Sequence, residues 1–256
     1  MSDFNPIDIS DSANHAIKNL TDCPTKRIGQ IISDAIYLKF GDISYKAKQR
    51  QVFEKYGLLE LEKRLKSCIK QIPIEKLMVP DFQTIMLAMD NLAPCINSED
   101  LRNLFANLLS RSCNIDYKDF LHPSFSEILR QMSPFDAKIL KFFVDTRPKE
   151  IITYTQFNDR TDYNVYIPYT FAEYPEPELF NYISISISSL LRLGILAFED
   201  DAIVHQISDS SFTRSSFYQK CEQERIAQGK YKSSRVEGQL CKLTPFGVAF
   251  VNVCFA

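Results

Sequence analysis

The stretch SEDLRNLFANLLSR, residues 98–111, carries the clearest structural signal in this 256-residue chain. Its apolar residues recur at the i, i+3, i+4, i+7 spacing that places side chains on one face of a helix. They are Leu101, Leu104, Phe105, Leu108 and Leu109. Ser98 stands at the start, where a helix N-cap is preferred. The stretch predicts the central helix of a bundle, with Phe105, Leu108 and Leu109 buried together.

The same periodicity extends on both sides of this stretch. Residues 61–72 place Leu61, Leu65 and Ile69 on one side, with charged residues opposite, until Pro73 ends the helix. Further helices are expected after Pro80 and from residues 133–136, where Ser, Pro and Asp occupy N-cap, N1 and N3 positions. We therefore expect an N-terminal helical domain over residues 1–132.

The pattern changes in the last part of the chain. Residues 147–177 hold four prolines and five tyrosines with little helical periodicity, which predicts a loop or short strands inserted in the second domain. Residues 180–193 then predict a helix, residues 195–198 a strand, and residues 239–243 a second strand before a helix capped at Thr244 and Pro245. This order is typical of a winged helix. The prediction is a mainly α protein, whose helical bundle is followed by a winged-helix-like α+β domain over residues 133–256.

Composition removes several classes of function. A net charge of -2 and a pI near 6.0 argue against a whole surface built for nucleic acid. The seven glycines form neither GxGxxG nor GxxxxGK[ST], the common phosphate-binding loops. The seven cysteines lack a CxxC pair, which favours free buried thiols over disulfides or a zinc site. We expect no cofactor and no metal.

The sequence also shows no recognisable secretory signal or membrane span. The first residues carry acids and no basic region followed by an apolar core, unlike a secretory signal. No run approaches the roughly 20 apolar residues of a membrane span. The expectation is a cytoplasmic protein with no membrane span.

Four stretches together resemble a known family: PTKRIGQIISDAIYLKFGDI (24–43), LRNLFANLLSRSCN (101–114), HPSFSEILRQMSPFDAKILKFF (122–143) and KLTPFGVAFVNVC (242–254). The chain resembles the bacterial abortive-infection alpha (Abi-alpha) family, nearly end to end. The resemblance implies a cytoplasmic bacterial protein associated with phage defence, and it carries over no catalytic residue. Within its motifs, Asn107, Arg111, His122 and Phe125 are candidate partner-binding residues.

His122 has two interpretations. It stands near Asp116, Asp119 and Glu127 in the sequence and could serve as a general base. However, Pro123 fits a first helical position, so His122 could simply close a helix N-terminus, and no nucleophile on a glycine elbow accompanies it. We favour the structural interpretation and assign no catalytic residue. An unrecognised hydrolase or nuclease is the weaker alternative.

Two hypotheses of function follow. The first is a non-enzymatic interaction or sensing module in phage defence, with a phage or host protein partner or with self-association. The second is a winged-helix DNA-binding regulator, in which helix 180–193 enters the major groove. Its outward face would consist of Asn181, Ser184, Ser188 and Arg192.

This outward face is poorly suited to base recognition, because only one of its four residues is a cation. Residues 214–235 are locally basic, and Lys230 and Lys232 in this segment could bind phosphates from the wing. A solvated amphipathic helix would show the same pattern. Weak, non-specific association with nucleic acid is therefore the most that we expect.

Overall fold

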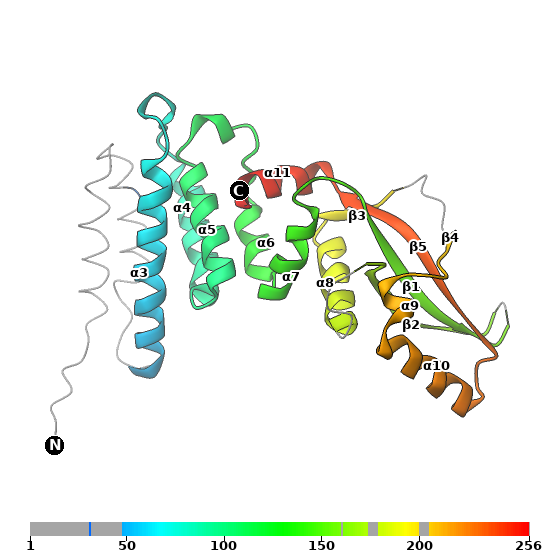
Figure 1. Ribbon diagram of the computed structural model, residues 1–256. Helices are drawn as coiled ribbons and strands as arrows, with labels where there is room; N and C mark the ends of the chain where they lie inside the picture. Colours follow the sequence, from blue (N-terminus) through cyan, green and yellow to red (C-terminus); the bar gives the residue numbers. More distant parts are fainter. Residues whose placement is uncertain (1–30, 32–47, 160, 174–178, 200–204, 256) are drawn as a thin grey trace, which may run out of the picture. The chain divides into compact units, whose positions relative to one another are not determined.

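The computed structural model describes residue 31 and residues 48–159, 161–173, 179–199 and 205–255 (Figure 1). The chain divides into two compact units, which we call unit 1 (Met1–Pro134 with Ala249–Ala256) and unit 2 (Phe135–Val248). The sequence suggested a boundary between residues 132 and 133 and placed the C-terminal residues in the second domain. In the structure, the last eight residues group with unit 1.

Unit 1 is helical. Its α-helices are α3 (Lys48–Lys70), α4 (Phe82–Leu92), α5 (Glu99–Arg111) and α6 (Phe125–Gln131), joined by the short 3-10 helices η1 (Ile74–Lys76), η2 (Ala93–Cys95) and η3 (Ile115–Tyr117). The end of α11 (Pro245–Cys254) completes it. Two of these helices begin with a side-chain cap. At the start of α5, the Ser98 side chain accepts a hydrogen bond from the Leu101 N–H, as predicted, and at the start of α4 the Asp81 side chain accepts one from the Thr84 N–H.

The core of unit 1 forms around α5, which packs against α3 and α6. Phe105, Leu108 and Leu109 are 0%, 2% and 1% exposed, so the burial predicted for them is confirmed. Phe125 of α6 packs edge-on against Phe250 of α11, with ring centres 5.3 Å apart. This aromatic pair joins the C-terminal residues to the core of unit 1.

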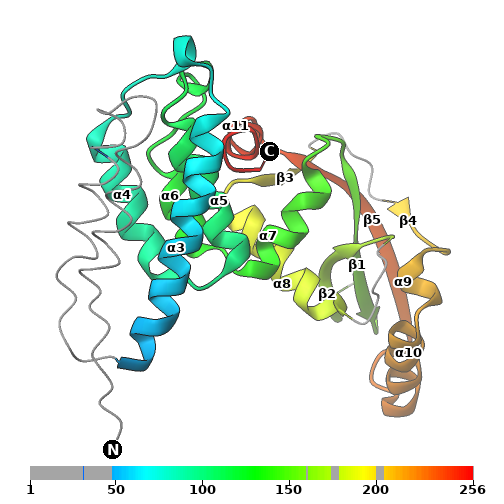
Figure 2. The same cartoon turned by 60° about the vertical axis from the view of Figure 1, so that its left-hand side comes forward.

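Unit 2 is built on a five-stranded antiparallel sheet in the order β2-β1-β5-β3, with β4 also paired to β5. The strands are β1 (Lys149–Phe157), β2 (Tyr163–Phe171), β3 (Leu196–Phe198), β4 (His205–Gln206) and β5 (Ser233–Leu243). β1 pairs with β5 along its whole length, from Lys149 opposite Cys241 to Phe157 opposite Ser233. Figure 2 shows β5 as the long curved strand that runs from α10 to α11.

The helices of unit 2 supply the rest of its core. They are α7 (Pro134–Leu140), which starts at the boundary between the units, η4 (Lys141–Phe143), α8 (Phe180–Arg192), α9 (Ser211–Arg214) and α10 (Ser216–Gln228). Tyr154 of β1, Phe180 of α8 and Phe212 of α9 are all fully buried and in ring contact. The buried Tyr154 hydroxyl donates to Glu222 at 2.5 Å, and Glu222 pairs with Arg225 at 2.7 Å, which satisfies these polar groups.

The predicted fold class is wrong, because the chain is a mixed α+β protein with a five-stranded sheet rather than a mainly α protein with a winged helix. The segment 147–177, expected as a loop or short strands, contains the two nine-residue strands β1 and β2, which are longer than expected. The segment 214–235, for which the sequence left open a wing or a solvated helix, contains helix α10 and the start of β5.

The prolines explain part of this error. Pro148 precedes β1, and Pro168 lies in β2, which is an edge strand where a missing N–H is tolerated. The β1 sequence KEIITYTQF is otherwise rich in the β-branched and aromatic residues that favour strands. Several local predictions for this part are nevertheless confirmed: α8, β3, the end of β5, and the α11 cap, where the Thr244 side chain accepts from the Gly247 N–H at 2.8 Å.

Candidate ligand-binding site

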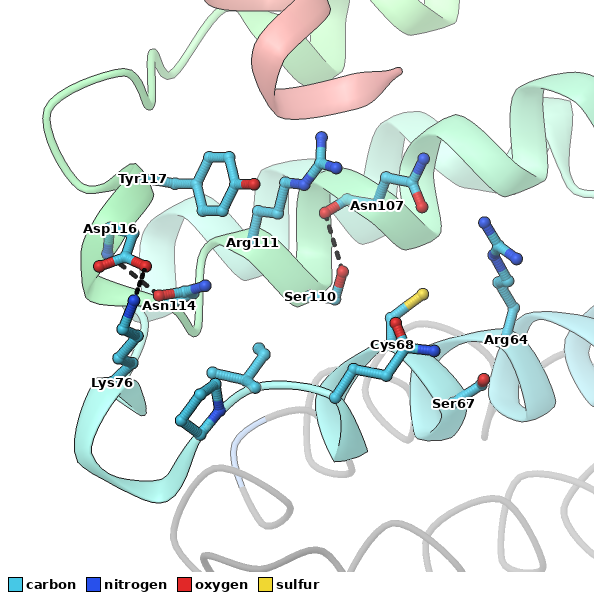
Figure 3. A pocket seen from close by; sticks show the side chains of 13 residues that line it. Arg64, Ser67, Cys68, Lys76, Asn107, Ser110, Arg111, Asn114, Asp116 and Tyr117 are labelled. Atoms are coloured by element: carbon cyan, nitrogen blue, oxygen red, sulfur yellow. Dashed lines mark hydrogen bonds and ion pairs between the residues drawn. The ribbon is translucent and has the colours of Figure 1, made fainter. Parts of the chain in front are cut away.

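A pocket of about 290 Å³ lies in unit 1, between α3 and α5 (Figure 3). Helix α3 contributes Arg64 and Cys68, which are four residues apart and therefore lie on one face. Helix α5 contributes Asn107, Ser110 and Arg111, which share a face for the same reason. Two helices that pack against each other thus supply part of the lining, and the segments that follow each helix supply the rest.

The α5 residues also hold the C-terminal end of α11. Asn107 is 7% exposed, and its Nδ2 donates to the Cys254 carbonyl oxygen at 2.8 Å. Nη1 of Arg111 donates to the Asn252 carbonyl oxygen at 2.6 Å, and the guanidinium lies 4.8 Å from the centre of the Tyr117 ring. The last carbonyls of a helix have no partner within the helix, so both bonds satisfy groups that would otherwise lack one. The positive charge of Arg111 is also favourable at a helix C-terminus.

A salt bridge stands at the opposite side of the pocket. Nζ of Lys76 lies 2.7 Å from the Asp116 carboxylate, and both side chains are close to half exposed. The hydrogen bond to Asp116 raises the pKa of Lys76, followed by the Coulombic attraction of the same carboxylate. Asn114 fixes Asp116 in turn, since its Oδ1 accepts from the Asp116 N–H at 3.0 Å. These bonds position η3 against the loop that follows α3.

Two of the four residues suggested by the family motifs, Asn107 and Arg111, line this pocket, and the other two do not. Phe125 is fully buried in the core. His122 is exposed, and its Nδ1 accepts from the Ser124 N–H at 3.2 Å and lies 2.6 Å from the Ser124 hydroxyl oxygen. The imidazole therefore closes the turn before α6, which fits a structural role. However, Ser124 is the N-cap and α6 begins at Phe125, so the first helical position predicted for Pro123 is wrong.

Two of the three carboxylates near His122 in sequence have cationic partners. Glu127 is hydrogen-bonded by Arg130, with 3.0 Å between Nε and Oε2, and Asp116 pairs with Lys76. Among the described residues, no group of three or more His, Cys, Asp or Glu side chains is placed to hold a metal ion. The six described cysteines are free, and Cys23 lies outside the described residues.

The residues suggested for nucleic-acid contact lie in unit 2 and do not form one outward face. Asn181 and Arg192 are exposed, but Ser184 is only 7% exposed, so its predicted outward position is wrong. Ser188 is half-buried, and its hydroxyl donates to the Ser184 carbonyl oxygen at 2.8 Å. A serine can bury itself in this way by bonding to the backbone one turn earlier.

The exposed apolar residues of α8 are instead Tyr182 and Ile185, at 63% and 68% exposure. Lys230 and Lys232 are exposed in the turn between α10 and β5, where Gly229 adopts a left-handed φ of 63°. Lys230 lies over the Tyr231 ring, 4.9 Å from its centre.

Sequence reasoning missed Arg64, Cys68 and Ser110. Arg64 was assigned to the solvated face of its helix, and that assignment agrees with its exposure. The sequence did contain a signal for these residues. Arg64 and Cys68 are four residues apart on α3, and Ser110 and Arg111 follow Asn107 by three and four residues on α5, so each set shares one face of its helix. That signal gains meaning only when the two helices are known to pack together.

A mixed α+β protein with a helical unit, a sheet unit and a polar pocket is thus defined. The family model described as abortive infection alpha matches residues 53–254. Because this match covers most of the chain, the chain belongs to the abortive infection alpha family. The resemblance found in the sequence is confirmed, although the quoted stretch 24–43 lies before the matched range and mostly outside the described residues.

Two further comparisons give no relative: no curated protein and no solved structure matches the chain. Within the described part of the chain, no helix is long and apolar enough to cross a membrane.

Proposed function

We propose that this chain acts in abortive infection as a non-enzymatic sensing module that binds a small ligand in the pocket between α3 and α5. The observation that carries the proposal is the pocket lining, in which α3 and α5 present guanidinium, amide and hydroxyl groups and η1 adds the ammonium group of Lys76. A volume of about 290 Å³ is at the lower end of small-molecule sites.

The chemistry of the lining favours binding over catalysis. Its thiol, Cys68, would need an adjacent base to act as a nucleophile, and no histidine is found among the described residues that line the pocket. Asp116 is the lining carboxylate, and it is engaged by Lys76. Arginine, lysine, asparagine and serine side chains can orient a ligand without taking part in bond breaking.

The pocket also offers a way to transmit occupancy. Asn107 and Arg111 line it and at the same time bond to the last carbonyls of α11. A ligand that competes for these donors would weaken the hold on the helix end. Occupancy would then change the C-terminal residues without any chemical step, which is what a sensor requires.

A phage-challenge assay tests this proposal. Bacteria that express the full chain should form fewer plaques than bacteria without it, and Arg64→Ala should lose this protection. Lys63→Ala is the matched control, because Lys63 is the exposed neighbour on α3 and does not line the pocket. Immunoblots should show equal amounts of each variant. If cells that express Arg64→Ala are protected as fully as cells that express the parent, the pocket is not required for the function.

A second variant separates sensing from catalysis. Cys68→Ser nearly keeps the size of the side chain and replaces the S–H donor of the thiol by an O–H donor. Protection should survive this change if the pocket only binds. Its loss, with the protein present at normal amounts, would instead indicate thiol chemistry.

A further inference from the structure

The charge of the pocket bears on what it binds. Among the residues that the structure describes, three cationic side chains line it, Arg64, Lys76 and Arg111, against one carboxylate, that of Asp116. The lining therefore carries an excess of two positive charges in a chain whose net charge is -2. Since Lys76 and Asp116 pair with each other at 2.7 Å, the excess resides on the two arginines.

Arg64 is the less constrained of these arginines. Figure 3 shows its side chain extending from α3 toward α5. It is exposed, and within the described part of the chain no carboxylate forms an ion pair with it. Its guanidinium therefore keeps a fork of N–H donors that matches a phosphate group.

Arg111 is held in place from two sides. The bond to the Asn252 carbonyl uses one of the five N–H donors of a guanidinium, and the Tyr117 ring lies beside the group at 4.8 Å. An arginine that is already ordered loses less side-chain entropy when it binds a ligand. Arg111 thus supplies a fixed cation, while Arg64 can close onto a ligand from the opposite helix.

Neutral donors complete the set. The Asn114 carboxamide oxygen accepts from the Asp116 N–H, which directs its amide group to other acceptors. Lys76 has three N–H donors, and its bond to Asp116 uses one. A phosphate group has several strongly accepting oxygens and needs such a number of donors around it.

We infer that the pocket between α3 and α5 binds a small phosphate-bearing molecule, an inference that rests on the proposed function. A phosphomonoester carries a charge of about -1.5 to -2 at neutral pH, which matches the excess of two positive charges. A monocarboxylate would neutralise only one of them. The small volume favours a single phosphate group or a mononucleotide over a longer chain of phosphates.

Calorimetric titration of the full chain tests the inference with inorganic phosphate, AMP, adenosine and acetate as probes. Phosphate or AMP should bind, whereas adenosine and acetate should not. Arg64→Ala should weaken binding about tenfold or more, as expected for the loss of a charge-assisted hydrogen bond. Lys63→Ala should bind as the parent does. Binding of inorganic phosphate without binding of AMP would indicate a site for the free anion. Tighter binding of AMP than of phosphate would indicate a nucleotide site.

Other results would overturn the assignment. Absence of binding by both phosphate and AMP at millimolar concentrations would do so, and so would equal binding by Arg64→Ala. Binding should also weaken below about pH 6, where a phosphomonoester becomes a monoanion. AMP affinity that stays constant from about pH 7 to about pH 5, about one unit on each side of that value, would oppose recognition of the dianion.

The two proposals can fail separately. If Arg64→Ala loses phage protection but neither phosphate nor AMP binds, the ligand class is wrong and the sensing pocket stands. If AMP binds through Arg64 but Arg64→Ala still protects, the site exists and the proposed function falls.

Discussion

Leu108→Ala probes the centre of unit 1. Leu108 lies in α5 at 2% exposure, beside Phe105 and Leu109. The change removes three buried carbons, worth about 2.4 kcal/mol at about 0.8 kcal/mol for each methylene. The cavity that remains adds to this loss, because the surrounding helices relax only in part. We therefore expect the free energy of unfolding to fall by about 2 to 5 kcal/mol.

Urea melts followed by circular dichroism measure this effect, since the chain has no tryptophan for fluorescence. Ile74→Ala is the control, because Ile74 is 75% exposed and its truncation should change stability by less than about 0.5 kcal/mol. A loss below about 0.5 kcal/mol for Leu108→Ala, with an unchanged denaturant slope, would refute the reasoning that this face of α5 is the core.

Two further predictions concern unit 2. Burial raises the pKa of Glu222, but its hydrogen bonds to Arg225, Tyr154 and Ser234 outweigh that effect and hold the pKa below its usual value of 4.5. The stability that these bonds contribute is present above pH 4.5 and is lost as the pH falls through the lowered pKa. In urea melts at decreasing pH, the free energy of unfolding should therefore fall less for Glu222→Gln than for the parent. Equal falls would contradict this prediction. Duplex DNA should bind weakly, with a log–log salt slope of about 0.9 per neutralised phosphate, and reversal of Lys230 and Lys232 to Glu should weaken binding further. Nanomolar, sequence-selective binding in a gel-shift titration would indicate a specific regulator instead.

The helices that carry local signals could be predicted from the sequence. Helix α5 combines an N-cap serine with a regular apolar face, and α11 starts at Thr244 and Pro245, which fit a cap and a first turn. Such signals act over a few residues, so they can be recognised without knowledge of the fold.

The sheet could not be predicted in the same way, because its central pairing is non-local. Lys149 of β1 lies opposite Cys241 of β5, and neither segment contains a local signal that identifies the other as its pairing partner. Pro168 added to the error, since a proline inside a strand suggests a loop unless the strand is known to be at an edge. The Tyr-rich segment 147–177 was therefore predicted as a loop or short strands of an insertion, although Tyr154 is at the centre of a core.

The candidate site shows the same limit. Asn107 and Arg111 were found through the family motif, but the motif does not say that they face a pocket. Arg64 has no local feature that separates it from the other charged residues of α3. Only the packing of α3 against α5 brings these side chains together.

The double role of Arg111 links the pocket to the end of α11. Its guanidinium lines the pocket and donates to the Asn252 carbonyl oxygen at 2.6 Å, so one group serves both the ligand and the helix end. Arg111→Ala would therefore mix lost binding with lost capping, and Arg64 is the better residue for testing binding alone. If a ligand competes for the donors of Arg111, binding must loosen the Asn252 contact. By linkage, any change that strengthens that contact must then weaken ligand binding by the same free energy.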